Sequence, residues 1–349
     1  MRAIVFDRHG SVDQLSLRDM PTPELGPRDA LIKVHAASLN GFDPMIVAGT
    51  TELRTPFPMI PGGDVAGEIV ALGPLAGERD PDLPDVFNLF DPARWKVGDR
   101  VLPFPVVPGE GMTGETRVGT CCEYVRFPTA NLIPIPDEIS YEDAVCLPIA
   151  YGTAYRMLHT NGSIRSGETV LILGATGGVG TCAVQLAKAA GAVVVAAGRD
   201  EWKVNKLKEL GADHVIDTSK DDFIAVCHDL FGKPRLRHFN RGVDVVVNYI
   251  GGETWDRCLR VLRHGGRMLT CGATAGYKVE MDLRYVWSYE QHLIGSNGWS
   301  PSDQLLMLGL VAQGEVKPII HAVRPLEETA AGIQDLIDRK FFGKIVIKP

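Results

Sequence analysis

The chain has 349 residues, of which 45% are hydrophobic and 23% charged, and its formal net charge at pH 7 is −7. One hydrophobic core seldom serves a chain of this length, so we expect two domains of an ordinary globular protein. The acidic balance argues against nucleic acid as a partner. No apolar run approaches the roughly 20 residues of a membrane span, and Met1–Gly10 lacks the layout of a signal peptide, so we expect a cytoplasmic protein with no membrane partner.

The first part of the chain is predicted to be rich in strands. Between Gly73 and Val97 lies an acidic insert with an apolar centre at residues 86–90. An ordered surface loop is the simpler interpretation of this insert, and a substrate lid or partner contact is the alternative. Short apolar runs bounded by turn residues predict the strands Ala3–Phe6, Leu15–Arg18, Ala30–Ala37 and Glu68–Leu72, with a further strand opening at Gly98.

A helical pattern with an interruption at Pro148 covers Ser140–His159, and a nucleotide-binding pattern follows it. Thr169–Leu173 predicts a strand, the glycine-rich stretch from Gly174 to Gly180 a turn, and Cys182–Ala190 a helix. A second strand, Val193–Ala197, would close a βαβ unit that holds a dinucleotide pyrophosphate at the helix N-terminus. The alternative is a purely structural glycine turn.

Each small residue of this turn has its own predicted role. Gly177 would let the backbone approach the phosphates, and Gly180 would let the helix pack closely on the strand. Ala175 stands where the fingerprint usually has its first glycine. The residues that we assign to the nucleotide here are Ala175, Thr176, Gly177, Gly178, Val179 and Gly180.

Strands and helices continue to alternate beyond the turn, which predicts a doubly wound parallel sheet. The predicted helices are Glu201–Leu210, Asp221–Phe231 and Trp255–Leu262. One short predicted strand ends at Asp217, and the other predicted strands are Val243–Tyr249, Arg267–Cys271 and Leu293–Gly295. The loop Gly232–Gly242 carries basic residues that we interpret as solvated surface, namely Lys233, Arg235, Arg237, His238 and Arg241.

The C-terminal part returns to the first domain. We predict a helix from Pro301 to Gln313, a helix Glu327–Arg339 and a last strand Lys344–Ile347. A catalytic domain of residues 1–149 and 297–349 would therefore enclose, in sequence, a nucleotide-binding domain of residues 150–296. The seven cysteines are scattered without a C-x-x-C pair, so we interpret them as reduced and mostly buried.

With these motifs in fixed order, the chain resembles the medium-chain dehydrogenase/reductase family. The resemblance implies an α/β protein with a GroES-like β-rich catalytic domain and a Rossmann doubly wound parallel sheet. The matching residues are Ser38–Asp43 with Gly49, Pro61–Gly67 with Gly73, Val97–Val101, Tyr151–Ala154, the glycine turn, Glu209–Asp213 and Phe342–Val346.

Alcohol dehydrogenases of this family hold a catalytic zinc, and the resemblance places its ligands at unsuitable residues here. The first Cys falls on Asn40, the His-Glu pair on Gly63 and Asp64, and the third ligand close to Val145. Zinc favours thiolate, imidazole and carboxylate, so we predict no metal. A remodelled site that uses Cys146, Asp64 and Asp43 is the alternative. The cysteine lobe of the structural zinc also has no counterpart, because Val101–Gly119 contains no cysteine.

The remaining motifs resemble the zinc-free quinone oxidoreductase branch, which implies hydride transfer to a quinone, enone or similar activated double bond. We predict that Asn40 donates a hydrogen bond to the substrate or the cofactor ribose, and that Asp43 orients the loop; turn formation is the plain alternative for both. Asp43–Phe57 lacks the Tyr proton donor of enoyl-thioester reductases. Tyr151 is the nearest candidate by motif position, although a core aromatic is the simpler interpretation.

The cofactor prediction depends on the end of the second strand. An acid about 20 residues beyond the glycines selects NAD, but the count reaches Arg199, preceded by Gly198. A cation there suits the 2′-phosphate of NADPH, Lys203 would add a second charge, and Asp200 is the complication. Further nicotinamide or cofactor contacts are predicted at Thr153, Ile250, Gly272, Ala273 and Thr274, and the resemblance adds Lys344.

Two other functions stay open at this point, an alcohol dehydrogenase with an unusual metal site and a nucleotide-binding protein without catalysis. The expected partner is a small-molecule substrate. A strand near Leu293–Gly298 could pair across a two-fold axis as in relatives, so a homodimer, or possibly a tetramer, is expected.

Overall fold

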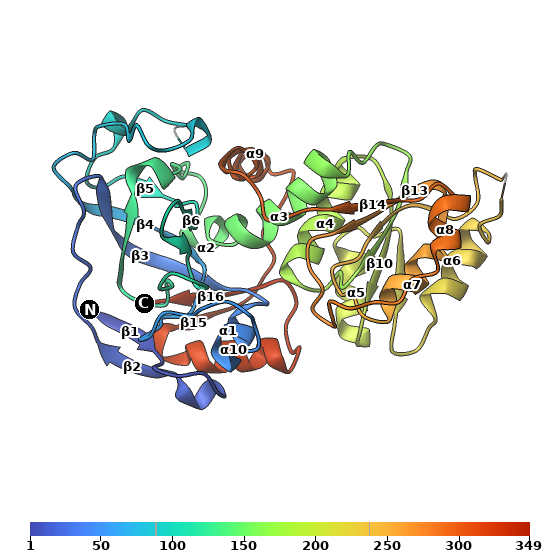
Figure 1. Cartoon of the computed structure of the whole chain (residues 1–349), viewed down its shortest axis with the longest axis horizontal. Coiled ribbons are helices and arrows are strands. Elements are labelled where there is room, and N and C mark those ends of the chain that lie inside the picture. Colours follow the sequence, from blue (N-terminus) through green and yellow to red (C-terminus); the bar gives the residue numbers. More distant parts are fainter. Residues whose placement is uncertain (88, 237) are drawn as a thin grey trace. The chain divides into compact units, whose positions relative to one another are not determined.

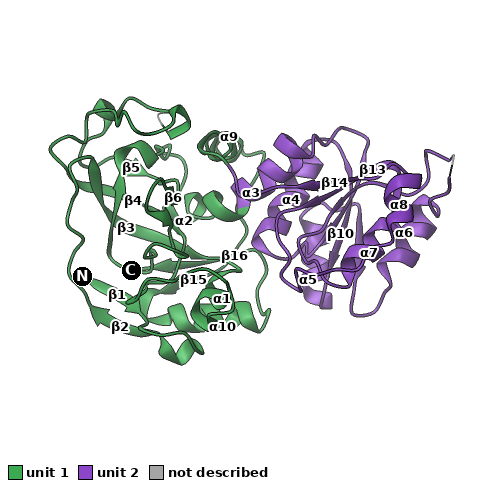
Figure 2. Ribbon diagram, in the orientation of Figure 1, with its two compact units in different colours: residues 1–150, 300–349 green, residues 151–299 purple. Residues whose placement is uncertain are grey.

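The structure is a computed structural model that describes residues 1–87, 89–236 and 238–349. The chain forms two compact units (Figure 2), unit 1 with residues Met1–Ala150 and Ser300–Pro349 and unit 2 with Tyr151–Trp299. The predicted domains, residues 1–149 with 297–349 and residues 150–296, stay a prediction.

Unit 1 is built on a mixed sheet in which β3 is the central strand. Its order is β15-β16-β3-β4-β5 (Figure 1), and β8 also pairs with β3. β3 is antiparallel to β4, β8 and β16, whereas β15 and β16 are parallel. The strands are β3 (Asp29–Leu39), β4 (Asp64–Leu72), β5 (Arg100–Val101), β8 (Tyr124–Pro128), β15 (Ile320–Pro325) and β16 (Lys344–Lys348), with the smaller pairs β1 (Arg2–Val5) with β2 (Ser16–Asp19) and β6 (Val106–Val107) with β7 (Gly111–Met112).

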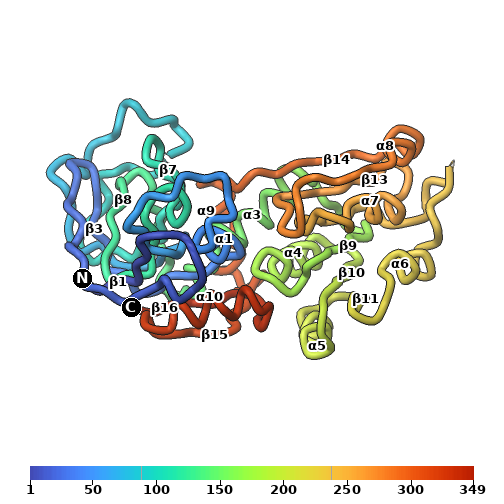
Figure 3. The backbone as a smooth tube through the Cα atoms, turned by 60° about the horizontal axis from the view of Figure 1, so that its bottom comes forward, coloured from blue at the N-terminus to red at the C-terminus, as the bar shows by residue number. Residues whose placement is uncertain are grey.

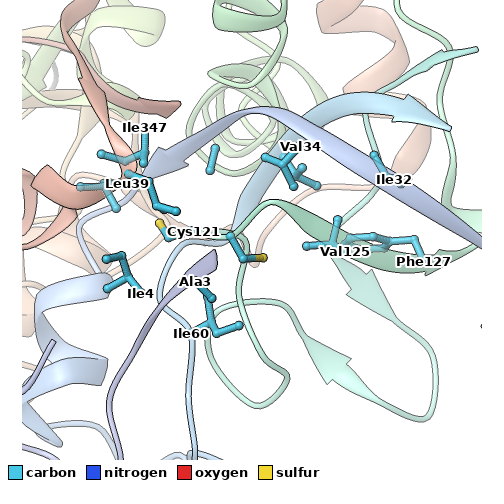
Figure 4. Close-up of a cluster of buried hydrophobic side chains, with 14 of the residues drawn as sticks. Ala3, Ile4, Ile32, Val34, Leu39, Ile60, Cys121, Val125, Phe127 and Ile347 are labelled. Atoms are coloured by element: carbon cyan, nitrogen blue, oxygen red, sulfur yellow. The ribbon is translucent and has the colours of Figure 1, made fainter. Parts of the chain in front are cut away.

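Apolar side chains of β3 and β8 form much of the core of unit 1. Ile32 and Val34 of β3 lie in one buried cluster with Val125 and Phe127 of β8 (Figure 4). Burial of a side chain of this size contributes about 1.5–3 kcal/mol. The register of β3 also matters for the site, because it pairs Ser38 with Asp64 on β4 and Leu39 with Ile345 on β16.

The helices of unit 1 include one that the sequence pattern did not reveal. The short helix α1 (Asp43–Ala48) has Pro44 in its first turn and ends at Gly49, whose φ of 71° favours glycine. Ser300 and Asp303 form a capping box at the start of α9. The other helices are α2 (Tyr141–Ala144), α9 (Pro301–Ala312) and α10 (Thr329–Ile337).

Unit 2 contains the predicted doubly wound sheet, with order β11-β10-β9-β12-β13-β14 and every pairing parallel. Figure 3 shows β13 and β14 side by side, with β14 as the edge strand. The α/β fold class is therefore confirmed. The strands are β9 (Thr169–Leu173), β10 (Val193–Gly198), β11 (His214–Asp217), β12 (Val243–Val247), β13 (Leu262–Thr270) and β14 (His292–Gly295).

The helical stretch around Pro148 begins in unit 1, and the helices of unit 2 then alternate in sequence with its strands. Around Pro148 the predicted helical stretch is divided into α2, the π-helical segments Leu147–Tyr151 and Arg156–Asn161, and α3 (Gly152–Tyr155) between them. A proline cannot donate a backbone hydrogen bond, which accounts for the interruption. The other helices are α4 (Gly178–Ala189), α5 (Glu201–Glu209), α6 (Phe223–Phe231), α7 (Thr254–Leu259) and α8 (Leu283–Ser288).

The acidic insert of unit 1 has little regular structure. It holds the single turns Asp85–Phe87 and Pro92–Arg94, and Phe90 packs edge-to-face on Trp95 with ring centroids 6.2 Å apart. Asn88, within the predicted apolar centre, and Arg237, within the predicted basic loop, lie outside the described residues. Whether the insert is a surface loop or a lid stays a prediction. Among the described residues, none of the helices has the length and apolar character needed to cross a membrane.

Candidate functional site

A buried polar cluster in unit 1 gathers at Asp64, the first residue of β4. The register of β3 and β4 places Ser38 opposite Asp64, and the Ser38 hydroxyl donates to Asp64 Oδ2 at 2.7 Å. Asn40 Nδ2 donates to the same oxygen at 2.8 Å, and the Ile149 N–H donates to Oδ1 at 3.0 Å. Asp64 is fully buried, so these bonds replace the water that a carboxylate would otherwise bind.

Lys344, the first residue of β16, adds a positive charge to this cluster. Its Nζ lies 3.2 Å from Asp64 Oδ2 and donates to Asn40 Oδ1 at 2.6 Å and to the Leu39 carbonyl at 2.9 Å. Only 2% of Lys344 is exposed. The predicted contact between Lys344 and the cofactor stays a prediction, and the structure places its ammonium group among groups of unit 1.

Asp43 holds the loop that carries Asn40. Its Oδ2 accepts the Asn40 N–H at 2.6 Å, and its Oδ1 accepts the Gly62 N–H at 2.8 Å. Burial raises the pKa of Asp43 to about 7, against the lowering effect of these two N–H donors. Asp43 thus ties the end of β3 to the turn before β4, and its predicted role in orienting the loop for catalysis stays a prediction.

The residues at the zinc position of the family do not form a suitable ligand set. A Cβ atom at Gly63, the position to which the family resemblance assigns a His, would lie 2.5 Å from Ile149 Cδ1 and 2.9 Å from Phe42 Cζ. Cys146 donates its thiol to the Glu142 carbonyl at 3.3 Å, and burial raises its pKa. In the part of the chain that the structure describes, no group of three or more His, Cys, Asp and Glu residues could hold a metal ion. Ile149 and Phe42 leave no room for a side chain at Gly63, and Asn40 offers no thiolate, so these residues do not fit zinc.

The glycine turn of unit 2 is closely packed at one end and open at the other. A Cβ at Gly180 would lie 2.4 Å from the Gly174 carbonyl oxygen and 2.6 Å from Ala175 Cα, so helix α4 can approach β9 only without a side chain there. For a Cβ at Gly177, by contrast, the nearest heavy atom of the protein is the Gly174 oxygen, at 3.8 Å. Tyr249 donates its hydroxyl to that same oxygen at 2.6 Å.

Helix α4 begins at Gly178, earlier than the predicted start at Cys182. The N–H groups of its first turn have no acceptor within the helix and carry the positive end of the helix dipole. They suit a pyrophosphate, so Gly178, Val179 and Gly180 fit the nucleotide role predicted for them. Thr176 lies beside the end of β10, because its Cγ2 would be 2.6 Å from a Cβ at Gly198.

The residues after β10 combine charges of both signs. Arg199 is exposed, whereas Lys203 is 3% exposed and its Nζ lies 3.1 Å from Asp200 Oδ2. Asp200 adopts a φ of 71°, a backbone conformation that residues other than glycine rarely adopt. Cationic and acidic side chains therefore lie together after β10, where residues that discriminate between NADPH and NADH are expected.

The remaining predicted residues of unit 2 fall into two groups. The segments after β12 and β13 meet, because the Thr274 N–H donates to the Tyr249 carbonyl at 3.3 Å and the Ala275 N–H to that of Ile250 at 2.7 Å. Ile250, Gly272, Ala273 and Thr274 thus lie at adjacent carboxyl ends of parallel strands, where such sheets bind ligands. Tyr151 is fully buried and Thr153 is 8% exposed.

The structure gives three residues contacts within these sites that were not expected from the sequence. Asp64 was considered only as a metal ligand, although it is the centre of the buried cluster. Ser38 matched the family motif without an assigned role, and its pairing with Asp64 required the strand register. Tyr249 stood at the end of a predicted strand, a place where ligand contacts are common, and this was the available signal.

Comparison with known proteins gives two family models. One, described as the alcohol dehydrogenase GroES-like domain, matches residues 26–137, and the other, described as zinc-binding dehydrogenase, matches residues 178–313. The order of the two matches agrees with a GroES-like part before a nucleotide-binding part.

Relatives and solved structures cover nearly all of the chain. Quinone oxidoreductase of Mus musculus is 30% identical over 97% of this chain and 94% of its own. Crotonyl-CoA reductase of Streptomyces avermitilis is 30% identical over 95% of this chain and 81% of its own. A crystal structure titled NAD-dependent alcohol dehydrogenase is 31% identical, covers 100% of both chains and has a TM-score of 0.86.

Proposed function

Since the chain belongs to the medium-chain dehydrogenase/reductase superfamily of oxidoreductases, we propose that it is an NADPH-dependent reductase of quinones, enones or similarly activated double bonds and that it works without a metal ion. The observation that carries this proposal is the buried cluster of Asn40, Asp64 and Lys344, in which Asn40 and Asp64 occupy positions that the family resemblance gives to zinc ligands.

The chemistry follows from what this cluster offers. Without a Lewis acid, nothing lowers the pKa of an alcohol hydroxyl, so simple alcohols are poor substrates. A conjugated acceptor takes hydride at carbon and moves negative charge onto an oxygen, where a hydrogen-bond donor stabilises the anion until a proton from water completes the reduction. Bound NADPH would supply the hydride. Asn40 is the donor that we assign, because its amide nitrogen has a second hydrogen beyond the one given to Asp64.

The choice of NADPH rests on the residues after β10. Arg199 is exposed and is the cation that we assign to the 2′-phosphate, and Lys203, which pairs with Asp200 on the first turn of α5, would add a second positive charge nearby. A guanidinium group binds phosphate with two parallel hydrogen bonds. The pyrophosphate would lie on the first turn of α4, and the carboxyl ends of β12 and β13 would contact the nicotinamide.

A screen of NADPH oxidation tests the function. Quinones, enones, an enoyl thioester and aldehydes are offered in turn, with and without a chelator, and NADH serves as the alternative donor. We expect turnover of a conjugated acceptor that the chelator leaves unchanged. Alcohol or aldehyde turnover that a chelator abolishes and added Zn²⁺ restores would instead support a dehydrogenase with a remodelled metal site. NADPH binding without turnover of any acceptor would indicate a non-catalytic nucleotide-binding protein.

The proposed assembly is a homodimer formed at the edge of unit 2. β14 is the outermost strand of its sheet, and its edge would pair with that of a second copy. Large apolar side chains are exposed on and before it, with Trp287 71%, Leu283 61% and Leu293 37% exposed. Sedimentation of wild type beside Leu293→Lys tests this, since a charge at the edge should give monomers.

The proposed location is the cytoplasm. All seven cysteines are free thiols, and six of them are buried. A reducing compartment keeps such thiols unpaired. Fractionation of cells that produce the tagged protein would test the location.

A further inference from the structure

The ammonium group of Lys344 has a complete set of partners. Its three contacts are the Leu39 carbonyl, Asn40 Oδ1 and Asp64 Oδ2, at 2.9, 2.6 and 3.2 Å. An ammonium group has three hydrogens, so these contacts use all of its donor capacity. Lys344 is also 2% exposed, which leaves its charge to act on its neighbours in unit 1 rather than on a ligand.

The two charges of the cluster together determine how the Asn40 amide is oriented. Its oxygen accepts from the Lys344 ammonium, and its nitrogen donates to the Asp64 carboxylate. A flip of the amide would turn its NH₂ group toward the cation and its oxygen toward the anion, and both contacts would become repulsive. Hydrogen bonds to charged groups are the stronger kind, so the orientation is well fixed.

This arrangement joins three distant parts of the sequence. Asn40 follows β3, Asp64 begins β4 and Lys344 begins β16, and the register of the sheet brings the three strands together. Asp43 fixes the backbone on the other side by accepting the Asn40 N–H. Both the main chain and the side chain of Asn40 are therefore held by buried charged residues.

We propose that Lys344 is a positioning residue for hydride transfer, which acts by holding the Asn40 amide so that its second Nδ2 hydrogen is presented to the substrate oxygen. The proposal rests on the function proposed above and deepens it. It replaces a cofactor contact of Lys344 with an indirect role, and it assigns to this lysine the fixed positive charge beside Asp64. A preorganised donor of this kind acts on the transition state, so its loss lowers kcat more than it weakens binding.

The test compares Lys344→Met with Lys348→Met. Lys348 lies on the same strand, is half exposed and pairs with Glu142 at 2.5 Å, so its loss removes a lysine of β16 outside the cluster. For Lys344→Met we expect kcat to fall at least about tenfold, while the Kd for NADPH and the KM for the acceptor change less than about threefold. For Lys348→Met we expect all three to stay within about twofold of wild type.

Two outcomes of this comparison would overturn the proposal. An increase of about tenfold or more in the Kd for NADPH, with kcat retained at saturation, would show that the ammonium group serves the cofactor. An unchanged kcat would show that Asn40 needs no such support. Because Lys344→Met leaves Asp64 without its cation and could fail to fold, the double variant Lys344→Met/Asp64→Asn is measured too, and it should fold and remain slow.

A second measurement does not depend on turnover. The side-chain amide of Asn40 is followed by NMR in protein labelled with ¹⁵N at asparagine, and Asn40→Ala identifies its signals. In wild type we expect slow hydrogen exchange of this NH₂ group, and in the double variant faster exchange by about tenfold or more. Unchanged exchange would sink the inference even if the acceptor screen succeeds. Failure of the screen with the expected exchange would sink only the proposed function.

Discussion

The glycine turn of unit 2 and the polar cluster of unit 1 are built in opposite ways. The turn is one continuous stretch, Gly174 to Gly180, that works through missing side chains. The cluster joins Asn40 to Lys344 across 304 positions and works through buried charges. A binding site for backbone contacts can thus be local in sequence, whereas a site that fixes one side chain needs partners from several strands.

The two regions also differ in what holds them in place. At the turn, van der Waals contact limits the backbone, as the 2.4 Å approach between the Gly174 oxygen and a Cβ at Gly180 shows. In the cluster, every charge depends on another charge that is equally buried. We therefore expect changes in the cluster to act first on stability and changes in the turn to act first on cofactor binding.

The largest effect is expected for Asp64→Ala. This variant leaves the buried Lys344 ammonium with two neutral partners, and such a loss costs about 3–5 kcal/mol of unfolding free energy. Urea denaturation gives the value. The matched control is Glu68→Ala on the same strand, whose side chain is 40% exposed, and it should cost less than about 1 kcal/mol. Equal effects of both variants would mean that the cluster does not depend on its charges.

The next effect is a pH dependence that originates at Asp43. Burial raises its pKa from 3.8 to about 7, so the folded state binds the proton more tightly than the unfolded state. The stabilisation is then complete below pH 3.8 and is lost as the pH rises toward 7, at up to about 1.4 kcal/mol per pH unit and roughly 4 kcal/mol in all.

The variant Asp43→Asn removes this titration. We expect wild type to lose unfolding free energy relative to Asp43→Asn as the pH rises across that window, as measured by urea denaturation at a series of pH values. Asp137→Asn, at a fully exposed side chain, should keep the dependence of wild type. A constant difference for Asp43→Asn would contradict the raised pKa.

The contrast also explains which parts of the fold the sequence could predict. Strands such as Thr169–Leu173 coincide with their predicted bounds, because apolar runs and glycine stops are local signals. α1, β8 and β15 were missed or left unassigned, since each is short and depends on tertiary contacts for its stability. β13 begins at Leu262, earlier than the predicted start at Arg267. Leu262 pairs with Val243 of β12, and a register shift separates this pair from the pair Val245–Arg267.

The residues of the candidate site also differ in whether the sequence could predict them. Asn40 and Asp43 were named from a motif, and the structure places both in one loop, but Asp64 and Ser38 were not recognised as their partners. The register between β3 and β4 brings Ser38 next to Asp64, and a single sequence does not reveal this register. The catalytic and cofactor roles of all these residues stay predictions.

The glycines allow the turn to be tested by two substitutions of equal size. Gly180→Ala places a methyl group against backbone atoms, so we expect a loss of about 1–3 kcal/mol in stability together with weaker NADPH binding. Gly177→Ala meets no close contact within the protein, so its melting temperature should be unchanged while the Kd for NADPH rises about tenfold or more. Calorimetry and NADPH fluorescence titration separate the two. Intact NADPH affinity in Gly177→Ala would contradict close backbone approach at the phosphates.

The smallest effect is expected at the end of β10, where only one exposed contact with the cofactor is altered. Arg199→Asp removes a cation that we assign to the 2′-phosphate and adds an acid that suits a ribose hydroxyl, so the preference for NADPH over NADH in kcat/KM should fall about tenfold, or 1.4 kcal/mol. Lys208→Asp, an exposed position later on α5, makes the same change in net charge and should leave the preference unaltered. An unchanged preference in Arg199→Asp would either place the phosphate contact on Lys203 or remove NADPH from the proposal.

The variant Lys203→Met distinguishes these two outcomes. It lowers the preference for NADPH only if the Lys203 ammonium, which lies beside Asp200, serves the phosphate.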